Sequence, residues 1–188
     1  MNRILIFIPI IALLYLGYMS YESGKTPEIP PLIDAPLPEF EFEEIDIDAV
    51  DGYGENAFFR HTDLPKRTVI INAFATWCST CIIEHDELIE LAQVHKIPLY
   101  GIAYRDKRAA VIRTLQKIGN PYTRIGNDPE GAELVKWRLY ATPETWIVDK
   151  NGRIRYHHRG FITKQDIKYI FLPLIEKIEA DVSSKEIN

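Results

Sequence analysis

Apolar and polar residues alternate along this chain with two different periods. Residues 69–75 and 97–104 are mainly apolar runs and predict buried central strands. Between them, the acid-rich run 82–94 predicts a helix that begins at a pair of cysteines. Strand and helix segments therefore alternate, which is typical of an α/β fold whose sheet is covered by helices on both faces.

Two further helices are predicted from their capping signals. Asp106 can cap a helix that runs to Ile118, with apolar residues along one face. Asp128-Pro129 resembles a cap followed by proline at the first helical position, and predicts a helix that runs to about Tyr140.

The C-terminal part predicts a hairpin and a final helix. Residues 144–149 and 154–161 read as strands joined across Asn151-Gly152, the strongest hairpin signal in the chain. A helix over residues 164–179 then places six apolar residues on one stripe that must pack on the sheet: Ile167, Ile170, Phe171, Leu174, Ile175 and Ile178. Residues 181–188 are expected to form a loose tail.

Residues 40–47 alternate apolar and acidic side chains, which predicts a half-buried strand, and a second short strand is expected near residues 57–59. The prolines of residues 25–38 disfavour helix and suit an extended tether over residues 22–38. The folded domain is therefore expected to span residues 39–180, with the two short strands as an N-terminal extension.

Residues 4–19 carry no charge. The length of this segment is near the short end of the roughly 17 to 25 apolar residues that span a bilayer. No small-residue cleavage pattern follows, so an uncleaved transmembrane signal anchor over residues 1–21 is favoured over a cleaved signal peptide or a buried helix. Arg3 precedes the segment, whereas Glu22 and a single Lys25 follow it. This predicts a single-pass protein of the inner membrane with its domain in the periplasm.

The overall charge narrows the function classes. The 188 residues carry a formal net charge of −5 and show no lysine or arginine cluster that would follow a phosphate backbone, which argues against nucleic-acid binding.

Cys78 and Cys81 are the only cysteines, in the sequence Trp77-Cys78-Ser79-Thr80-Cys81. In an oxidising compartment such a C-x-x-C pair is meaningful as a redox device.

Other readings of the cysteine pair are weaker. A zinc site needs about four ligands and would have to recruit histidines, and haem attachment requires histidine where this chain has Ile82. A purely structural disulfide would close too short a loop to stabilise the fold much. A helix N-terminus beside Cys78 would instead stabilise its thiolate, so we predict that Cys78 is the exposed, attacking thiol and Cys81 the covered, resolving one.

Several motifs resemble one family. The chain resembles the CcmG/DsbE proteins of the thioredoxin superfamily, on segments that go beyond the cysteine pair: residues 72–81, Glu84-His85, 101–106, 119–122 and 141–145. This resemblance implies a thioredoxin-like fold with a central mixed β-sheet, and a membrane-anchored thiol:disulfide oxidoreductase of cytochrome c maturation without a cofactor or metal. Family members usually have proline where this chain has Ser79.

The resemblance also implies partners. Such a protein is kept reduced by a membrane thiol electron donor of the DsbD/CcdA type, and it reduces the haem-binding cysteines of apocytochrome c alongside other cytochrome c maturation components. The alternatives are a general periplasmic thiol reductase, a chaperone that binds apocytochrome c without redox chemistry, and a copper-delivery module.

Glu84 is the candidate catalytic acid. Thioredoxin has a buried aspartate at the position of Asn72, so the acid must come from elsewhere. Glu84 falls on the helix stripe of Cys81 and should face the sheet, where a carboxyl keeps a raised pKa and can exchange a proton with the Cys81 sulfur. The alternative is a surface glutamate near the helix N-terminus.

The remaining candidates line the expected substrate groove. Thr142-Pro143 is expected to be a cis peptide whose backbone pairs with substrate beside the cysteines. Glu144 is expected to favour basic partners, and Trp77 to shield the sulfurs. Tyr104 and Asp106 are expected to border the groove, although Asp106 is also explained as a helix cap. His157 and His158 are adjacent on a strand and face opposite ways, which argues against a shared metal.

Overall fold

The computed structural model describes residues 11–18, 30–49 and 58–186. It divides into a unit of residues 1–30, in which residues 11–18 are helical, and a unit of residues 31–188. Within the described part of the chain, no helix combines the length and apolar character that crossing a bilayer requires. Residues 1–10 and 19–21 of the expected anchor lie outside the described residues, so the anchor stays a prediction.

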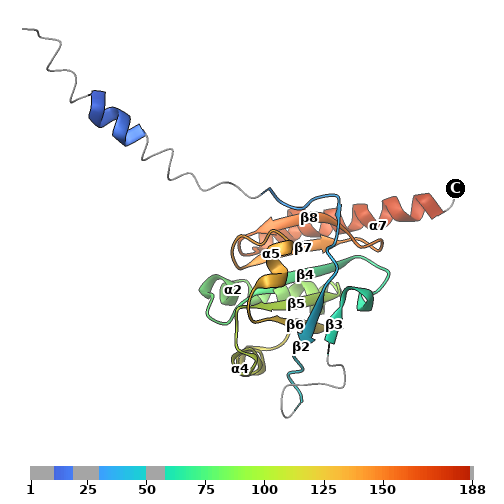
Figure 1. Ribbon diagram of the computed structural model, residues 1–188. Helices are drawn as coiled ribbons and strands as arrows, with labels where there is room; N and C mark the ends of the chain where they lie inside the picture. The colour runs from blue at the N-terminus through green and yellow to red at the C-terminus, as the bar shows by residue number, and fades with distance from the viewer. Residues whose placement is uncertain (1–10, 19–29, 50–57, 187–188) are drawn as a thin grey trace, which may run out of the picture. The chain divides into compact units, whose positions relative to one another are not determined.

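The described strands form one eight-stranded mixed sheet in the order β1-β8-β7-β4-β5-β6-β2-β3 (Figure 1). Its central strands β4, β5 and β6 are parallel, and the remaining pairs are antiparallel. The strands are β1 (Ala35–Pro36), β2 (Glu41–Glu44), β3 (Phe58–Arg60), β4 (Val69–Phe74), β5 (Leu99–Tyr104), β6 (Arg124–Asp128), β7 (Glu144–Val148) and β8 (Arg153–Arg159).

Helical segments connect these strands. The run predicted after the cysteines is helical throughout, with a break at Glu84, and the last predicted helix continues beyond its expected end to Glu186. Residues 181–186 of the expected loose tail are therefore helical. The segments are η2 (His61–Asp63), α2 (Ser79–Ile83), α3 (His85–Ile89), η3 (Glu90–Val94), α4 (Arg108–Ile118), α5 (Ala132–Lys136), α6 (Lys164–Asp166), η4 (Ile167–Phe171) and α7 (Leu172–Glu186).

Side chains of β4 alternate between two core clusters, one on each face of the sheet. Ile70 and Phe74 join the cluster to which α3, α4, η4 and α7 contribute, whereas Ile71 and Ala73 join an aromatic-rich cluster on the other face. All six residues of β4 are buried. The second cluster includes six aromatic residues: Phe40, Phe42, Phe59, Tyr100, Trp137 and Trp146. The prediction of a sheet covered on both faces is confirmed.

Strand β6 was not predicted from the sequence. Gly126, Asn127 and Asp128 have low strand propensity, but the segment pairs with β5 on one side and with β2 on the other. Gly126 is required by packing, because a Cβ at this position would lie 2.8 Å from the Cβ of Phe42. Tertiary pairing therefore overrides local preference at this edge of the parallel sheet.

The helix expected over residues 128–140 is shorter than predicted. It begins after Gly131, whose φ of 73° is left-handed, and ends at Lys136. The carboxylate of Asp128 still serves this helix, because it accepts the backbone N–H of Leu134 at 2.9 Å. The cap is thus supplied from the end of β6 and not from the residue next to the helix.

The boundary between tether and domain also differs from the prediction. The expected tether includes residues 31–38, but β1 pairs with β8 through Ala35 and Ile154. The backbone N–H of Leu37 donates to the carbonyl of Gly152 at 2.8 Å. Prolines are compatible with this edge position, because an edge strand needs few ladder donors.

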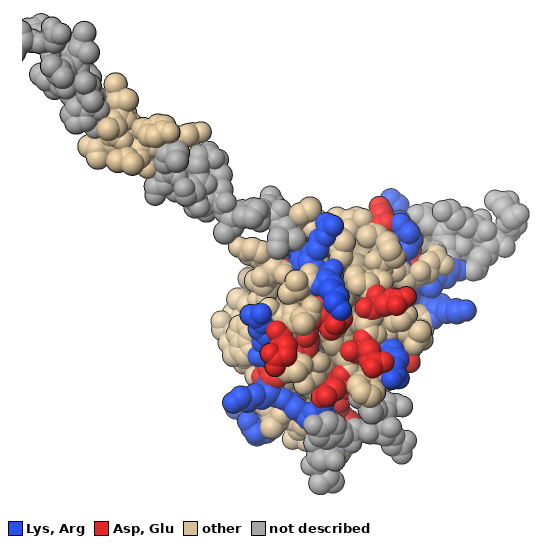
Figure 2. All heavy atoms as spheres, in the orientation of Figure 1, with Lys and Arg blue, Asp and Glu red and all other residues tan. Residues whose placement is uncertain are grey.

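Charges on the domain surface are mixed in sign. Figure 2 shows acidic and basic side chains interspersed over the visible face of the domain. Ion pairs also link separate elements of the domain, for example Arg124 with Glu44 and Asp63. This face offers no continuous basic surface of the kind that follows a nucleic-acid backbone.

We predict that Gly126→Ala lowers the free energy of unfolding by about 1–3 kcal/mol, because the added methyl group overpacks the buried Phe42 side chain. Denaturant unfolding of the parent and the variant measures this difference. In a Phe42→Ala background the same substitution should cost less, since the Cγ and Cδ2 atoms that lie 2.9 Å from the added methyl group are absent and only the Cβ contact remains. Equal costs in both backgrounds would contradict the packing explanation.

Candidate functional site

The two cysteines lie at the junction of the central strand β4 and helix α2. Cys78 is the N-cap residue of α2 and forms a disulfide with Cys81, with their Cα atoms 5.3 Å apart. The Sγ atom of Cys78 accepts a hydrogen bond from the backbone N–H of Cys81 at 3.2 Å. Because N–H groups at a helix N-terminus stabilise negative charge, this position favours the thiolate of Cys78 once the disulfide is reduced.

Both cysteines are nearly covered. Cys78 is 6% exposed and Cys81 is 5% exposed, so the expectation that Cys78 stands out at the surface is wrong. Their surroundings differ, since Cys78 occupies the N-cap and Cys81 the first turn of the helix. The assignment of Cys78 as the attacking thiol now rests on its contact with helix N–H donors, and it stays a prediction.

The loop before β7 brings the backbone of Thr142 next to Cys78. The Thr142-Pro143 peptide bond is cis, as predicted. The carbonyl oxygen of Thr142 lies 3.5 Å from the Sγ of Cys78, and the carbonyl of Pro143 accepts the N–H of Gly160 at 3.0 Å. The loop is thus held from the β8 side and places main-chain groups beside the disulfide.

Asp106 holds the turn that precedes the cysteines. Its carboxylate accepts the backbone N–H of Thr76 at 2.5 Å and the Thr76 hydroxyl at 3.1 Å. The N-cap residue of α4 is Lys107, so the explanation of Asp106 as the helix cap is wrong. The Asp106 residue is buried, and its carboxylate positions the cysteine turn instead of bordering an open groove.

Trp77 and Tyr104 have different environments. Trp77 is 61% exposed beside Cys78, and its indole N–H donates to the carbonyl of Arg105 at 3.1 Å. Tyr104 is half-buried against the aromatic-rich cluster, and the Arg105 guanidinium lies 5.3 Å from its ring centre. Trp77 is therefore available to a partner, whereas the substrate contact expected of Tyr104 stays a prediction.

Glu144 is buried, which contradicts its expected role in attracting basic partners. It is 1% exposed, and one carboxylate oxygen accepts the backbone N–H groups of Tyr140 at 2.9 Å and Ala141 at 3.1 Å. The other oxygen lies 2.6 Å from Nε2 of His157. The charge of Glu144 is thus used inside the domain, to hold the loop that carries Thr142.

Glu84 is the C-cap residue of α2, the helix that carries the cysteines, and is 0% exposed, so the alternative of a surface glutamate is wrong. One of its carboxylate oxygens accepts from Nδ2 of Asn72 at 3.0 Å, and the other accepts the backbone N–H of Ile162 at 2.8 Å. Glu84 follows Cys81 by three residues, which places both on one side of the helix. A buried carboxyl group is thereby fixed on the side of the helix that carries Cys81.

Burial raises the pKa of Glu84 from 4.5 to about 7, and the charge of Glu87 adds to this. The hydrogen bonds from Ile162 and Asn72 act in the opposite direction, since they stabilise the carboxylate. A pKa near neutrality suits a group that both accepts and returns a proton at physiological pH.

Sequence reasoning missed the residues that surround Glu84. The hydroxyl of Tyr122 donates to Oδ1 of Asn72 at 2.8 Å, and Nδ2 of Asn72 also donates to the hydroxyl of Thr145 at 3.0 Å. Tyr122 and Thr145 belong to the two family-like segments 119–122 and 141–145, but no local pattern indicates that they meet at Asn72. The backbone of Ile162 likewise carries no sequence signal.

His157 and His158 point to opposite faces of the sheet, as predicted. His157 stacks on Trp146 with ring centres 4.8 Å apart, and His158 packs against Phe171 on the other face. Within the described residues, no group of three or more histidine, cysteine or acidic side chains is arranged to hold a metal ion.

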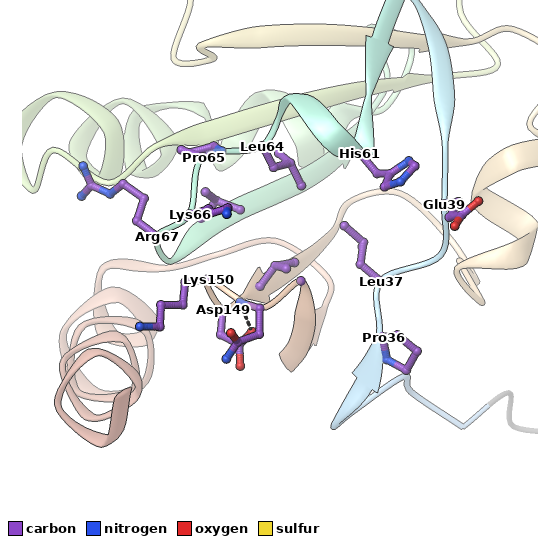
Figure 3. A pocket seen from close by; sticks show the side chains of 14 residues that line it. Pro36, Leu37, Glu39, His61, Leu64, Pro65, Lys66, Arg67, Asp149 and Lys150 are labelled. Carbon is purple, nitrogen blue, oxygen red and sulfur yellow. Dashed lines mark hydrogen bonds between the residues drawn. The ribbon is translucent and has the colours of Figure 1, made fainter. Parts of the chain in front are cut away.

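A cavity of about 300 Å³ lies at the opposite end of β4 from the cysteines (Figure 3). It opens between the loop before β4 and the β7–β8 turn, and mixes apolar with basic side chains. Its lining includes Leu37, His61, Leu64, Lys66, Arg67 and Val69. None of the predicted site residues lines it, so this cavity is separate from the disulfide.

Known proteins resemble this chain in sequence and fold. The Redoxin family model matches residues 34–170. A thiol:disulfide interchange protein DsbE of Vibrio cholerae is 32% identical over 96% of this chain and 98% of its own length. A DsbE of Xylella fastidiosa is 31% identical, and the match spans 63% of this chain but only 60% of that relative. A secreted thiol-disulfide isomerase of Corynebacterium glutamicum shares the fold with a TM-score of 0.62 at 22% identity, over 74% of this chain and 85% of that one.

We predict that Glu84→Gln removes a pH dependence of stability. The folded protein keeps the Glu84 proton up to about pH 7, whereas the unfolded chain releases it near pH 4.5, so the free energy of unfolding falls as the pH rises through this interval. The total is about 3 kcal/mol. Denaturant unfolding from pH 4 to 8 should show this slope in the parent and in Glu87→Gln, but not in Glu84→Gln. A slope that persists in Glu84→Gln would assign it to another group.

Proposed function

Because this chain belongs to the Redoxin family and is a thiol:disulfide oxidoreductase of the DsbE type, we propose that it reduces the haem-binding cysteines of apocytochrome c on the periplasmic side of the inner membrane. The observation that carries this proposal is the Cys78–Cys81 disulfide at the N-terminus of α2, with the backbone of Thr142 beside it. The DsbE relatives are called thiol:disulfide interchange proteins.

The reaction exchanges two electrons through a mixed disulfide. In the reduced protein, the Cys78 thiolate attacks one sulfur of a substrate disulfide and releases the other substrate sulfur as a thiolate. The Cys81 thiolate then attacks the Sγ of Cys78 and releases the second substrate thiolate. The substrate is reduced, and this protein ends with the Cys78–Cys81 disulfide seen in the structure.

Glu84 handles the proton of Cys81 in this cycle. Cys81 must lose its proton before it attacks, and Glu84 is the buried carboxyl on the same side of the helix. Its pKa of about 7 lets it accept that proton when ionised and release it afterwards. Regeneration requires an external dithiol, for which a membrane donor of the DsbD/CcdA type is proposed.

Exposed apolar side chains around the cysteines support a polypeptide substrate. Trp77, Ile82 and Ile83 are exposed on the cysteine turn and the following helix. Tyr140 is exposed two residues before Thr142. Phe161 is also exposed, and it follows Gly160, whose backbone N–H donates a hydrogen bond to the carbonyl of Pro143. A substrate chain that pairs with the Thr142 backbone as an added strand would contact these side chains.

The substrate proposal is tested with reduced full-length protein and matched peptide disulfides. One peptide carries the haem-binding pattern C-x-x-C-H, and the control peptide has the same composition and cysteine spacing with the histidine moved elsewhere. Faster reduction of the first peptide supports the apocytochrome role. Equal rates favour a general periplasmic reductase, and normal cytochrome assembly in a Cys78→Ser, Cys81→Ser strain favours a chaperone.

We predict that Cys81→Ser traps a mixed disulfide between Cys78 and the substrate, because the resolving thiolate is missing. Non-reducing electrophoresis and mass spectrometry of the adduct check the expected link. The matched variant Cys78→Ser should form little adduct. If Cys78→Ser traps substrate instead, the roles of the two cysteines are reversed.

A further inference from the structure

A buried hydrogen-bonded chain connects Tyr122 to Glu84 through the side chain of Asn72. The Tyr122 hydroxyl lies 2.8 Å from Oδ1 of Asn72, whose Nδ2 lies 3.0 Å from Oε1 of Glu84. The same Nδ2 lies 3.0 Å from the hydroxyl of Thr145. The four residues come from separate segments and are all buried, so water does not replace a lost partner at low cost.

The two ends of the Asn72 amide have the same shape but opposite hydrogen-bonding character. With the observed orientation, both hydrogens of the NH2 group are used, toward Glu84 and Thr145, and the oxygen needs a donor from elsewhere. Tyr122 supplies that donor. Turning the amide by half a turn would point its oxygen at the Glu84 carboxylate, which is repulsive when Glu84 is ionised.

Tyr122 is suited to remain a donor. Burial, and then the charge of Glu84, raise the pKa of Tyr122 well above its ordinary value of 10, so its hydroxyl keeps its proton at physiological pH. Its ring stacks on Phe74 with centres 4.8 Å apart, which fixes the position of the hydroxyl.

We propose that Tyr122 is a positioning residue, whose hydroxyl keeps the NH2 group of Asn72 directed at Glu84 and so stabilises the carboxylate form of Glu84. The proposal deepens the proposed proton-transfer role of Glu84 and rests on it for its catalytic meaning. The groups that face Glu84 are the Asn72 amide, the N–H of Ile162, the charge of Glu87 on the same helix, and Tyr122.

Removing the hydroxyl has a defined consequence. In Tyr122→Phe the oxygen of Asn72 has lost its donor, so the observed orientation loses its advantage over the turned one, in which the NH2 group faces the phenyl ring and the oxygen accepts from the Thr145 hydroxyl and from a protonated Glu84. That orientation favours the protonated carboxyl. The proton affinity of Glu84 should therefore rise about tenfold, which is an upward pKa shift of about one unit.

The direct test is titration of the Glu84 carboxyl by carbon-13 NMR in the oxidised full-length protein. Tyr122→Phe should raise the Glu84 pKa by about one unit and keep the ring stack on Phe74. Tyr100→Phe is the matched control, since it removes the hydroxyl of a buried tyrosine that stacks on Phe59 in the other core cluster. It should leave the Glu84 pKa unchanged. An unchanged pKa in Tyr122→Phe would overturn the proposal.

A double-variant experiment tests whether the effect passes through the amide. In an Asn72→Ala background, Tyr122→Phe should no longer shift the Glu84 pKa, because no amide remains to be oriented. A shift of the same size in that background would overturn the proposed route. The carboxyl titration does not depend on catalysis, so it separates this proposal from the function of Glu84.

The pH dependence of disulfide exchange then tests the catalytic meaning. If Glu84 transfers the proton of Cys81, the pH profile of the exchange rate in Tyr122→Phe shifts upward together with the Glu84 pKa. A shifted carboxyl pKa with an unchanged rate profile would retain the positioning role of Tyr122 and reject the proton-transfer role of Glu84.

Discussion

The antiparallel pairing of β4 with β7 is the contact on which the redox site depends. Its register places Asn72 opposite Thr145 and Ala73 opposite Glu144. The strand that leads into the cysteine turn and the strand that follows Thr142-Pro143 are thereby aligned, so the Thr142 carbonyl meets the sulfur of Cys78. Because side chains on a strand alternate between faces, a register shift of one residue would exchange Asn72 with a core residue.

Three buried carboxyl groups hold different parts of this site. Asp106 fixes the turn before the cysteines, Glu144 fixes the loop before β7, and Glu84 lies at the end of the cysteine helix and holds the backbone at Ile162. Each accepts hydrogen bonds from backbone N–H groups, which offset the cost of removing a carboxylate from water. Burial raises the pKa of Glu84 to about 7, which suits this carboxyl group to proton exchange.

The elements that the sequence predicted well are those with a strong local pattern. The central strand β4 is a continuous apolar run, the Asn151-Gly152 turn selects a hairpin, and the last helix carries an apolar stripe over three turns. The cysteine pair and the cis Thr142-Pro143 peptide were recognisable from motifs in the same way. In each case, the residues that determine the feature are close together in the sequence.

The features that the sequence did not predict depend on residues far apart in the chain. Strand β6 forms because β2 and β5 offer pairing partners, although Gly126 and its neighbours disfavour a strand. Glu144 was expected at the surface, but the loop and His157 enclose its charge. By itself, the sequence determined the central strands β4 and β5, the hairpin, the last helix and the disulfide chemistry, because periodicity, turn residues and cysteine spacing are local. Only the tertiary structure decided which acids are buried and that Tyr122 and Asn72 meet at Glu84, because these contacts exist only once the sheet has assembled.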